Sequence, residues 1–191
     1  MTSSAGLTPG GENMNTDMHE KMPFYYQRTG PYADLPYHRH TIRTDGCGIV
    51  SFAMAATYLL ERKVEPPELV KWAGRRFSGF SGRGTRGVFF VKAAEAYGLS
   101  CTPTNDLTCA LHSLRNGCPV IYYTRKSGGI FSDIPHYLVL SGITEEGRVR
   151  IHNPNGMNDG KDFPIEMIEK FRARSIREKS FYIIKKGKSD R

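Results

Sequence analysis

Three observations predict a single α+β domain. Helical patterns occupy the first half of the chain and strand patterns the second, which is the segregated order of an α+β fold. No internal repeat and no linker-like stretch divides the sequence. At 191 residues with 39% hydrophobic content, the chain can bury one sizeable core. We therefore expect a disordered polar tail over residues 1–22, a folded domain over 23–186 and a basic tail over 187–191.

The first half of the chain contains the helical patterns. Residues 23–44 are rich in Tyr, Pro and His and lack a helical period, so they predict extended chain and turns. Residues 47–62 are apolar on nearly every face, which is typical of a buried helix. Pro or Asp near a start and Gly near an end indicate three further helices, over residues 66–77, 88–97 and 105–115. A glycine-rich loop over residues 78–87 separates the first two of them.

The second half contains most of the strand patterns. Residues 136–143 and 148–152 are joined by the turn-like Glu145-Glu146-Gly147, which predicts an antiparallel hairpin. A mostly antiparallel sheet is therefore expected here. Its other elements are three further strands and one short helix, in chain order: strands over residues 99–102, 119–124 and 180–185, and a helix over 164–171.

The net charge of +8 is concentrated in residues 170–179 and 185–188. Such a basic surface can attract nucleic acid or anionic lipid. A solvated helix face and a frayed tail explain it better, because aromatic residues do not interleave with the cations as in single-strand binders. We therefore expect no specific nucleic-acid partner.

The chain shows no stretch of about 20 apolar residues and no secretory apolar segment near its start, so neither a membrane span nor a signal is expected. Its four cysteines are too sparse for a disulfide scaffold. Reduced thiols in a cytoplasmic, monomeric protein are the expectation, with export by another route left open.

Cys47 is the residue with the strongest chemical signal. It stands between Gly46 and Gly48, directly before the apolar helical run. The glycines allow a sharp turn and leave space beside the sulfur. A thiol at a helix N-terminus feels the positive end of the helix dipole, which lowers its pKa and favours the reactive thiolate. Cys47 is therefore a candidate nucleophile.

A cysteine nucleophile needs a base, and the base needs a group that orients it. His136 opens an apolar strand after a turn-like segment, so its imidazole can face a cleft while the strand stays in the core. Pairing around the hairpin turn sets Asn153 opposite or just beyond His136. An Asn side-chain oxygen can fix the imidazole tautomer. Asn155 and Asp133 are weaker alternatives for this role.

The order Cys, His, Asn, with the cysteine on a helix and the other two on a sheet, resembles the papain-like cysteine peptidases. Finer detail is similar to one branch, the bacteriocin-processing peptidases that remove double-glycine leaders, in a standalone form. The segments that carry this resemblance extend over about residues 24–185: Tyr26-Gln27, Asp45-Gly46-Cys47-Gly48 with Ser51 and Ala53-Met54, Ala93 with Tyr97-Gly98-Leu99, Gly117 with Pro119-Val120, and His136-Tyr137-Leu138-Val139-Leu140 with Gly142.

The resemblance implies a papain-like fold and two oxyanion donors, the side chain of Gln27 and the backbone N–H of Cys47. Three positions depart from the family pattern. Thr41 stands six residues before Cys47, where papain has its Gln, so Gln27 must arrive by a longer loop. Pro135 precedes the histidine where Gly is common, and Asn153 stands where Asp is frequent in this branch.

The implied reaction is thiol acyl transfer on a peptide or protein substrate, without a metal or organic cofactor. Peptide-bond hydrolysis is the first hypothesis. Amidase or transpeptidase chemistry on the same residues and a catalytically inactive binding module of the same fold remain open. Specificity would then depend on the loops over residues 78–87 and 126–135.

Other motifs have simpler explanations. The G-x-G-x-x-G pattern from Gly82 to Gly87 lacks the preceding strand that a dinucleotide site requires. Cys109 and His112 have a helical spacing suited to zinc, but the remaining cysteines are loosely placed. The double glycine at positions 10 and 11 lacks a leader-like amphipathic segment, so a tail explains it better than self-cleavage.

Overall fold

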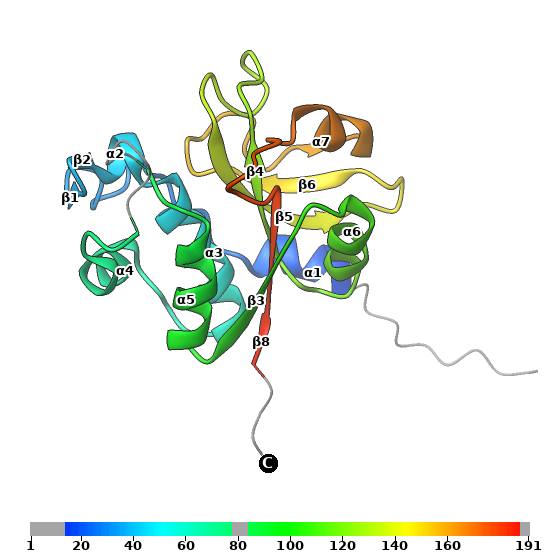
Figure 1. The fold of residues 1–191 in the computed structure, drawn as a ribbon. Helices are drawn as coiled ribbons and strands as arrows, with labels where there is room; N and C mark the ends of the chain where they lie inside the picture. The colour runs from blue at the N-terminus through cyan, green and yellow to red at the C-terminus, as the bar shows by residue number, and fades with distance from the viewer. Residues whose placement is uncertain (1–13, 78–83, 188–191) are drawn as a thin grey trace, which may run out of the picture.

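A computed structural model describes residues 14–77 and 84–187 of the protein. Within them the chain forms a six-stranded antiparallel sheet in the order β3-β8-β4-β5-β6-β7, with helices on both sides (Figure 1). The predicted α+β class is confirmed. The helices are α1 (Met14–Lys21), α2 (Ile42–Asp45), α3 (Cys47–Leu60), α4 (Pro66–Ala73), α5 (Val88–Ala96), α6 (Leu107–Arg115) and α7 (Ile165–Phe171).

A separate two-stranded ladder precedes α2. The strands are β1 (Pro36–Tyr37), β2 (His40–Thr41), β3 (Leu99–Thr104), β4 (Val120–Thr124), β5 (His136–Ile143), β6 (Val149–His152), β7 (Asp162–Phe163) and β8 (Phe181–Lys186). Among the described residues, no helix has the length and apolar character that crossing a bilayer demands.

Strand β5 lies at the centre of the fold. All its residues are buried, as expected for a strand that is covered on both faces. Helices α3 and α5 lie on one side of the sheet, and α1 and α6 lie on the other (Figure 1). Helix α3 is itself apolar nearly all round, so it fills the space between β5 and the outer helix α4, while α5 packs directly on the sheet at β3.

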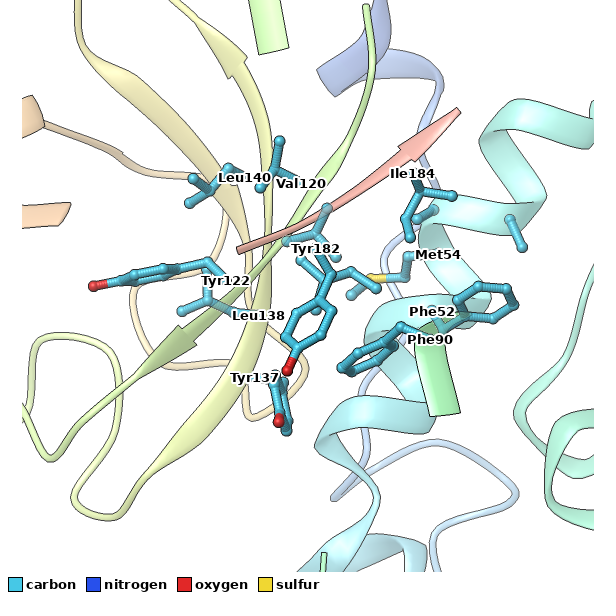
Figure 2. Close-up of a cluster of buried hydrophobic side chains, with 14 of the residues drawn as sticks. Phe52, Met54, Phe90, Val120, Tyr122, Tyr137, Leu138, Leu140, Tyr182 and Ile184 are labelled. Carbon is cyan, nitrogen blue, oxygen red and sulfur yellow. The ribbon is translucent and has the colours of Figure 1, made fainter. Parts of the chain in front are cut away.

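The largest part of the core lies between α3, α5 and the sheet. Phe90 of α5 packs edge-on against Tyr137 of β5, with ring centroids 5.0 Å apart, and approaches Tyr182 of β8 at 4.7 Å. Phe52 and Met54 of α3 lie beside them (Figure 2). Aromatic pairs in these arrangements add stability beyond the area that they bury.

The glycines beside Cys47 allow two close contacts. A Cβ on Gly46 would lie 2.6 Å from the carbonyl oxygen of Ile42, and a Cβ on Gly48 would lie 2.7 Å from the Cβ of Thr85. We expected these glycines to leave space beside the sulfur. Instead, they let α2 and the Thr85 segment pack directly onto the start of α3.

Helix α1 differs from the sequence-based expectation. The expectation of a disordered tail through residue 22 is wrong for residues 14–22, because residues 14–21 are helical and Met18 and Met22 are fully buried. The helix is polar, so its composition does not reveal the burial of Met18 within it and of Met22 directly after it. Residues 1–13 and 188–191, with the double glycine at positions 10 and 11, lie outside the described residues.

A buried polar bridge fastens α1 to the sheet. The Oγ of Ser141 in β5 lies 2.7 Å from Nδ1 of His19 and 2.8 Å from Nδ1 of His152. Nε2 of His152 donates to the carbonyl oxygen of Met22 at 3.1 Å, because a carbonyl can only accept. Nδ1 of His152 therefore accepts from the Ser141 hydroxyl, which in turn accepts from Nδ1–H of His19. Within this bridge, the hydroxyl of Ser141 and both ring nitrogens of His152 are therefore hydrogen-bonded.

Other boundaries moved by a few residues. Strand β3 continues to Thr104, and α4 ends at Ala73, where Gly74 adopts a φ of +53°. Asp106 rather than Asn105 caps α6, since its carboxylate accepts from the backbone of Thr108 and Cys109. The segment expected to be extended holds β1, β2 and α2, and the short edge strand β7 was not expected at all.

We predict that Gly48→Ala lowers the free energy of unfolding by about 1–3 kcal/mol, because the new Cβ would overlap the Cβ of Thr85. Thermal or urea unfolding measures the loss. The double variant with Thr85→Gly removes the clashing atom, so the two effects should be less than additive. Strictly additive losses would show that the close contact is not the cause.

We predict that stability falls as the pH drops from about 7 to 4. Burial lowers the pKa of His19 to about 4, with a further contribution from Arg150, and burial lowers the pKa of His152 to about 3. The unfolded chain therefore takes up protons first, near pH 6.5, and His152 alone should cost about 3 kcal/mol by pH 4. Urea unfolding at several pH values measures this. The His152→Gln variant should be less stable at pH 7 and less dependent on pH; an unchanged pH slope would contradict the role of His152.

Candidate active site

Three of the four predicted site residues, Gln27, Cys47 and His136, line one cavity of about 1110 Å³. Cys47 is the first residue of α3 and His136 is the first residue of β5, so the packing of helix on strand brings them to one side of the molecule. The fourth residue, Asn153, follows the end of β6 and contacts His136.

His136 and Asn153 form a buried hydrogen bond. His136 Nε2 lies 2.9 Å from Asn153 Oδ1, and the two residues are 3% and 1% exposed. The Asn153 amide nitrogen donates to the carbonyl oxygens of Phe131 (2.9 Å) and Met157 (2.8 Å), so its oxygen is the atom that faces the imidazole. Nε2 of His136 therefore carries the proton, and Nδ1 is the basic nitrogen.

The register of the hairpin differs from the expected one. Val139 pairs with His152, and continuing this register sets Asn153 level with Leu138. Asn153 thus lies two positions short of His136, rather than opposite or beyond it, and its side chain reaches the imidazole diagonally.

The two alternatives for the orienting role make other contacts. Asn155 donates from its side chain to the Phe131 carbonyl at 3.0 Å and lines the cavity. Asp133 accepts from the backbone of Gly129 at 3.2 Å. The imidazole of His136 is therefore partnered by Asn153.

The Cys47 sulfur lies beside the start of β5. Burial raises the pKa of the Cys47 thiol to about 11, although the backbone N–H groups of Tyr137 and Gly48 lie within hydrogen-bond reach and oppose this increase. The sequence-based expectation of a lowered thiol pKa is therefore wrong, because desolvation outweighs the favourable end of the helix. Cys47 nevertheless stays partly exposed to the cavity.

Burial has the opposite effect on the imidazole of His136. It lowers the pKa of His136 to about 4, the hydrogen bond that His136 donates to Asn153 partly offsets this, and the charge of Arg28 lowers the pKa further. Near neutral pH, both Cys47 and His136 therefore hold their neutral forms. A neutral imidazole is competent to accept a proton.

Gln27 is held in place at both its backbone and its side chain. Its backbone N–H donates to Pro154, just after Asn153, at 2.8 Å, and Nε2 donates to the carbonyl oxygen of Arg43 in α2 at 3.0 Å. The residue is 4% exposed. Gln27 stands further before Cys47 in the sequence than Thr41 does, and the longer loop that this requires brings Gln27 into the lining of the Cys47 cavity. One amide hydrogen bonds Arg43, which leaves the second for another acceptor.

Sequence reasoning missed two supports of the site. Thr85 accepts or donates a hydrogen bond of 2.7 Å with Tyr37 while packing on Gly48. Glu178 accepts from the backbone of Gly87 at 2.7 Å and from Tyr182 at 2.9 Å. Neither has a spacing signal in the sequence, because each contact joins segments far apart in the chain.

The described residues contain no group of three or more His, Cys, Asp or Glu side chains arranged to hold a metal ion. Cys109 is exposed, and His112 contacts Asn116 within the same helix. Residues 78–83, which include part of the glycine-rich pattern, lie outside the described residues.

Comparison with known proteins identifies the fold and the family of the chain. Two solved structures share the fold: a protein from Bacillus anthracis assigned to the C39-like peptidases (TM-score 0.58, 19% identity, 85% of this chain and 93% of the other) and the peptidase domain of Streptococcus ComA, a bifunctional ABC transporter involved in quorum sensing (TM-score 0.52, 17% identity, 72% and 88%). A search of curated proteins found no match. The model of the Peptidase_C39-like family matches residues 19–181. The chain therefore belongs to the Peptidase_C39-like family, which supports a cysteine peptidase function.

Proposed function

We propose that the protein hydrolyses peptide bonds through a covalent acyl-enzyme on Cys47. His136 acts as the base and then as the acid, Asn153 orients the imidazole, and Gln27 with the Cys47 backbone N–H binds the oxyanion. The observation that carries the proposal is the His136–Asn153 hydrogen bond of 2.9 Å. It leaves the basic nitrogen of a neutral imidazole available in the cavity that Cys47 also lines.

The reaction starts from the neutral pair. The thiol proton moves to Nδ1 of His136 while the sulfur forms its bond to the substrate carbonyl carbon, and the carbonyl oxygen takes the negative charge. The intermediate then collapses, the C–N bond breaks, and His136 gives its proton to the leaving amine. Water attacks the resulting thioester with His136 taking up its proton, and the acid product leaves as the thiol is restored.

We predict that iodoacetamide alkylates Cys47 rapidly at pH 6, because neutral His136 takes up the proton of the thiol as the sulfur attacks. Because the pKa of His136 is about 4, the alkylation rate should fall only as the pH drops towards that value. Mass spectrometry of individual cysteines measures the rates, with the exposed Cys109 as internal reference.

The variant His136→Ala should slow Cys47 alkylation about tenfold or more, whereas His112→Ala, a histidine of α6, should leave it unchanged. Cleavage of a degenerate peptide library by the wild-type protein should be lost in Cys47→Ala. Alkylation of Cys47 no faster than that of Cys109 would overturn the catalytic proposal. Rapid alkylation without library cleavage would instead favour amidase or transpeptidase chemistry.

We predict that Gln27→Ala lowers kcat/KM for peptide cleavage by about 100-fold, equivalent to about 3 kcal/mol of oxyanion stabilisation. It should change the alkylation of Cys47 by less than about twofold, because alkylation at a tetrahedral carbon develops no oxyanion. Thr41→Ala is the matched control, since Thr41 stands where papain has its Gln. An equal loss of alkylation and cleavage would indicate that Gln27 supports the structure of the site rather than the oxyanion.

A further inference from the structure

A second cavity of about 630 Å³ adjoins the cavity that contains Cys47. The two share Tyr123, Pro135 and Ser175 in their linings, and Pro135 directly precedes His136. The second cavity leads from the base to the C-terminal end of α7, and we call it the α7 groove. It is lined by Tyr123, Arg125, Pro135, Glu169, Lys170, Arg172, Ala173, Arg174 and Ser175.

The α7 groove is strongly positive. Four of its lining side chains are cationic, Arg125, Lys170, Arg172 and Arg174, and Glu169 is the one carboxylate among them. A single oxygen of Glu169 contacts Arg172 at 2.9 Å and Arg174 at 3.1 Å. One carboxylate cannot neutralise four cations, so the groove keeps a surplus of positive charge.

Two of these cations, Arg125 and Lys170, are positioned by contacts with the end of α7. The Arg125 guanidinium donates to the carbonyl oxygen of Lys170 at 2.9 Å and lies 5.5 Å from the Phe171 ring centroid. The Lys170 ammonium lies 5.3 Å from the same ring. The negative end of the α7 dipole accounts for Arg125, which bonds a C-terminal carbonyl. It does not account for Arg174, which follows the helix in sequence, pairs with Glu169 and is 75% exposed.

Positive charge continues into the Cys47 cavity, which Arg28 and Arg86 also line. Arg177 lines this cavity too, and the carboxylates of the cavity are Asp45 and Glu178, so the cations outnumber the carboxylates by one. A chain that is bound across the catalytic residues therefore passes from a moderately positive cavity into a strongly positive groove.

We propose that the α7 groove binds an acidic segment of the peptide substrate, on one side of the bond that is cleaved. This inference rests on the proposed peptidase function and names its substrate class. The groove opens into the cavity of the nucleophile, so its occupant is continuous with the chain that reacts, which favours a peptide over a nucleic acid. Complementary charge of this kind contributes mainly to selectivity and to the rate of association.

The test compares two double variants of equal charge change. Lys170→Gln with Arg174→Gln removes two cations of the groove, and Lys71→Gln with Arg115→Gln removes two exposed cations that line neither cavity. In the degenerate library, the wild-type protein and the control should enrich Asp and Glu within a few residues on one side of the cleaved bond. The groove variant should lose this enrichment while still cleaving neutral peptides.

A binding experiment separates this inference from the proposed reaction. Fluorescence anisotropy in the Cys47→Ala background compares a labelled Glu-rich peptide, its Gln-for-Glu analogue and a single-stranded DNA of equal charge. The groove variant should bind the acidic peptide about fivefold more weakly at low salt, the control should change less than about twofold, and added salt should reduce the difference.

Each outcome of these two experiments is decisive. Cleavage without an acidic preference, together with equal binding by the two double variants, overturns the groove proposal and leaves the peptidase proposal intact. Groove-dependent binding of the acidic peptide without any cleavage supports the groove and overturns the peptidase. Groove-dependent binding of the DNA in preference to the peptide overturns the proposed occupant.

Discussion

The site depends on the packing of the apolar helix α3 against the fully buried strand β5. Cys47 is the first residue of that helix and His136 the first of that strand. The proposed nucleophile and the proposed base, from segments far apart in the chain, therefore line one cavity where both elements begin. Because both elements are buried along nearly their whole length, neither can shift without disturbing the core. The glycines at 46 and 48 also fix the start of the helix, because their lack of a side chain lets Ile42 and Thr85 pack directly against it.

The bridge centred on Ser141 extends this constraint to the rest of the site. It ties β5 to His152, which directly precedes Asn153, and through His152 to the carbonyl oxygen of Met22. Phe24 stacks on the His152 ring at 3.9 Å, two residues further along the segment that leads to Gln27. The proposed orienting residue and the proposed oxyanion donor therefore share one anchor on the strand that carries the proposed base.

The sequence predicted those parts whose signals are local. The apolar run of α3 and the hairpin of β5 and β6 were visible because periodicity reports burial directly. The register of Asn153 was predicted wrongly, because pairing centred on Glu145 and Glu146 sets Asn153 level with Leu138 and not with His136. The ladder shift between Leu140 and Gly142 moves Asn153 one position toward His136, and turn residues do not reveal it. Helix α1 was missed for a different reason. Its few buried side chains leave no apolar period, and its attachment depends on histidines that meet Ser141 only in the folded chain.

The pKa shifts of the site could not be predicted from the sequence either, because they depend on burial in the folded chain. A cysteine at a helix start favours a thiolate, yet in the folded protein desolvation raises the thiol pKa and lowers that of His136. The two shifts act together: they keep the pair neutral, so in the proposed reaction the proton transfer accompanies the attack and is not complete in the resting state. Asn153 favours the imidazolium that forms during attack, and Arg28 opposes it. An acidic substrate segment that reached Arg28 would weaken this opposition, so substrate charge would influence the base as well as binding.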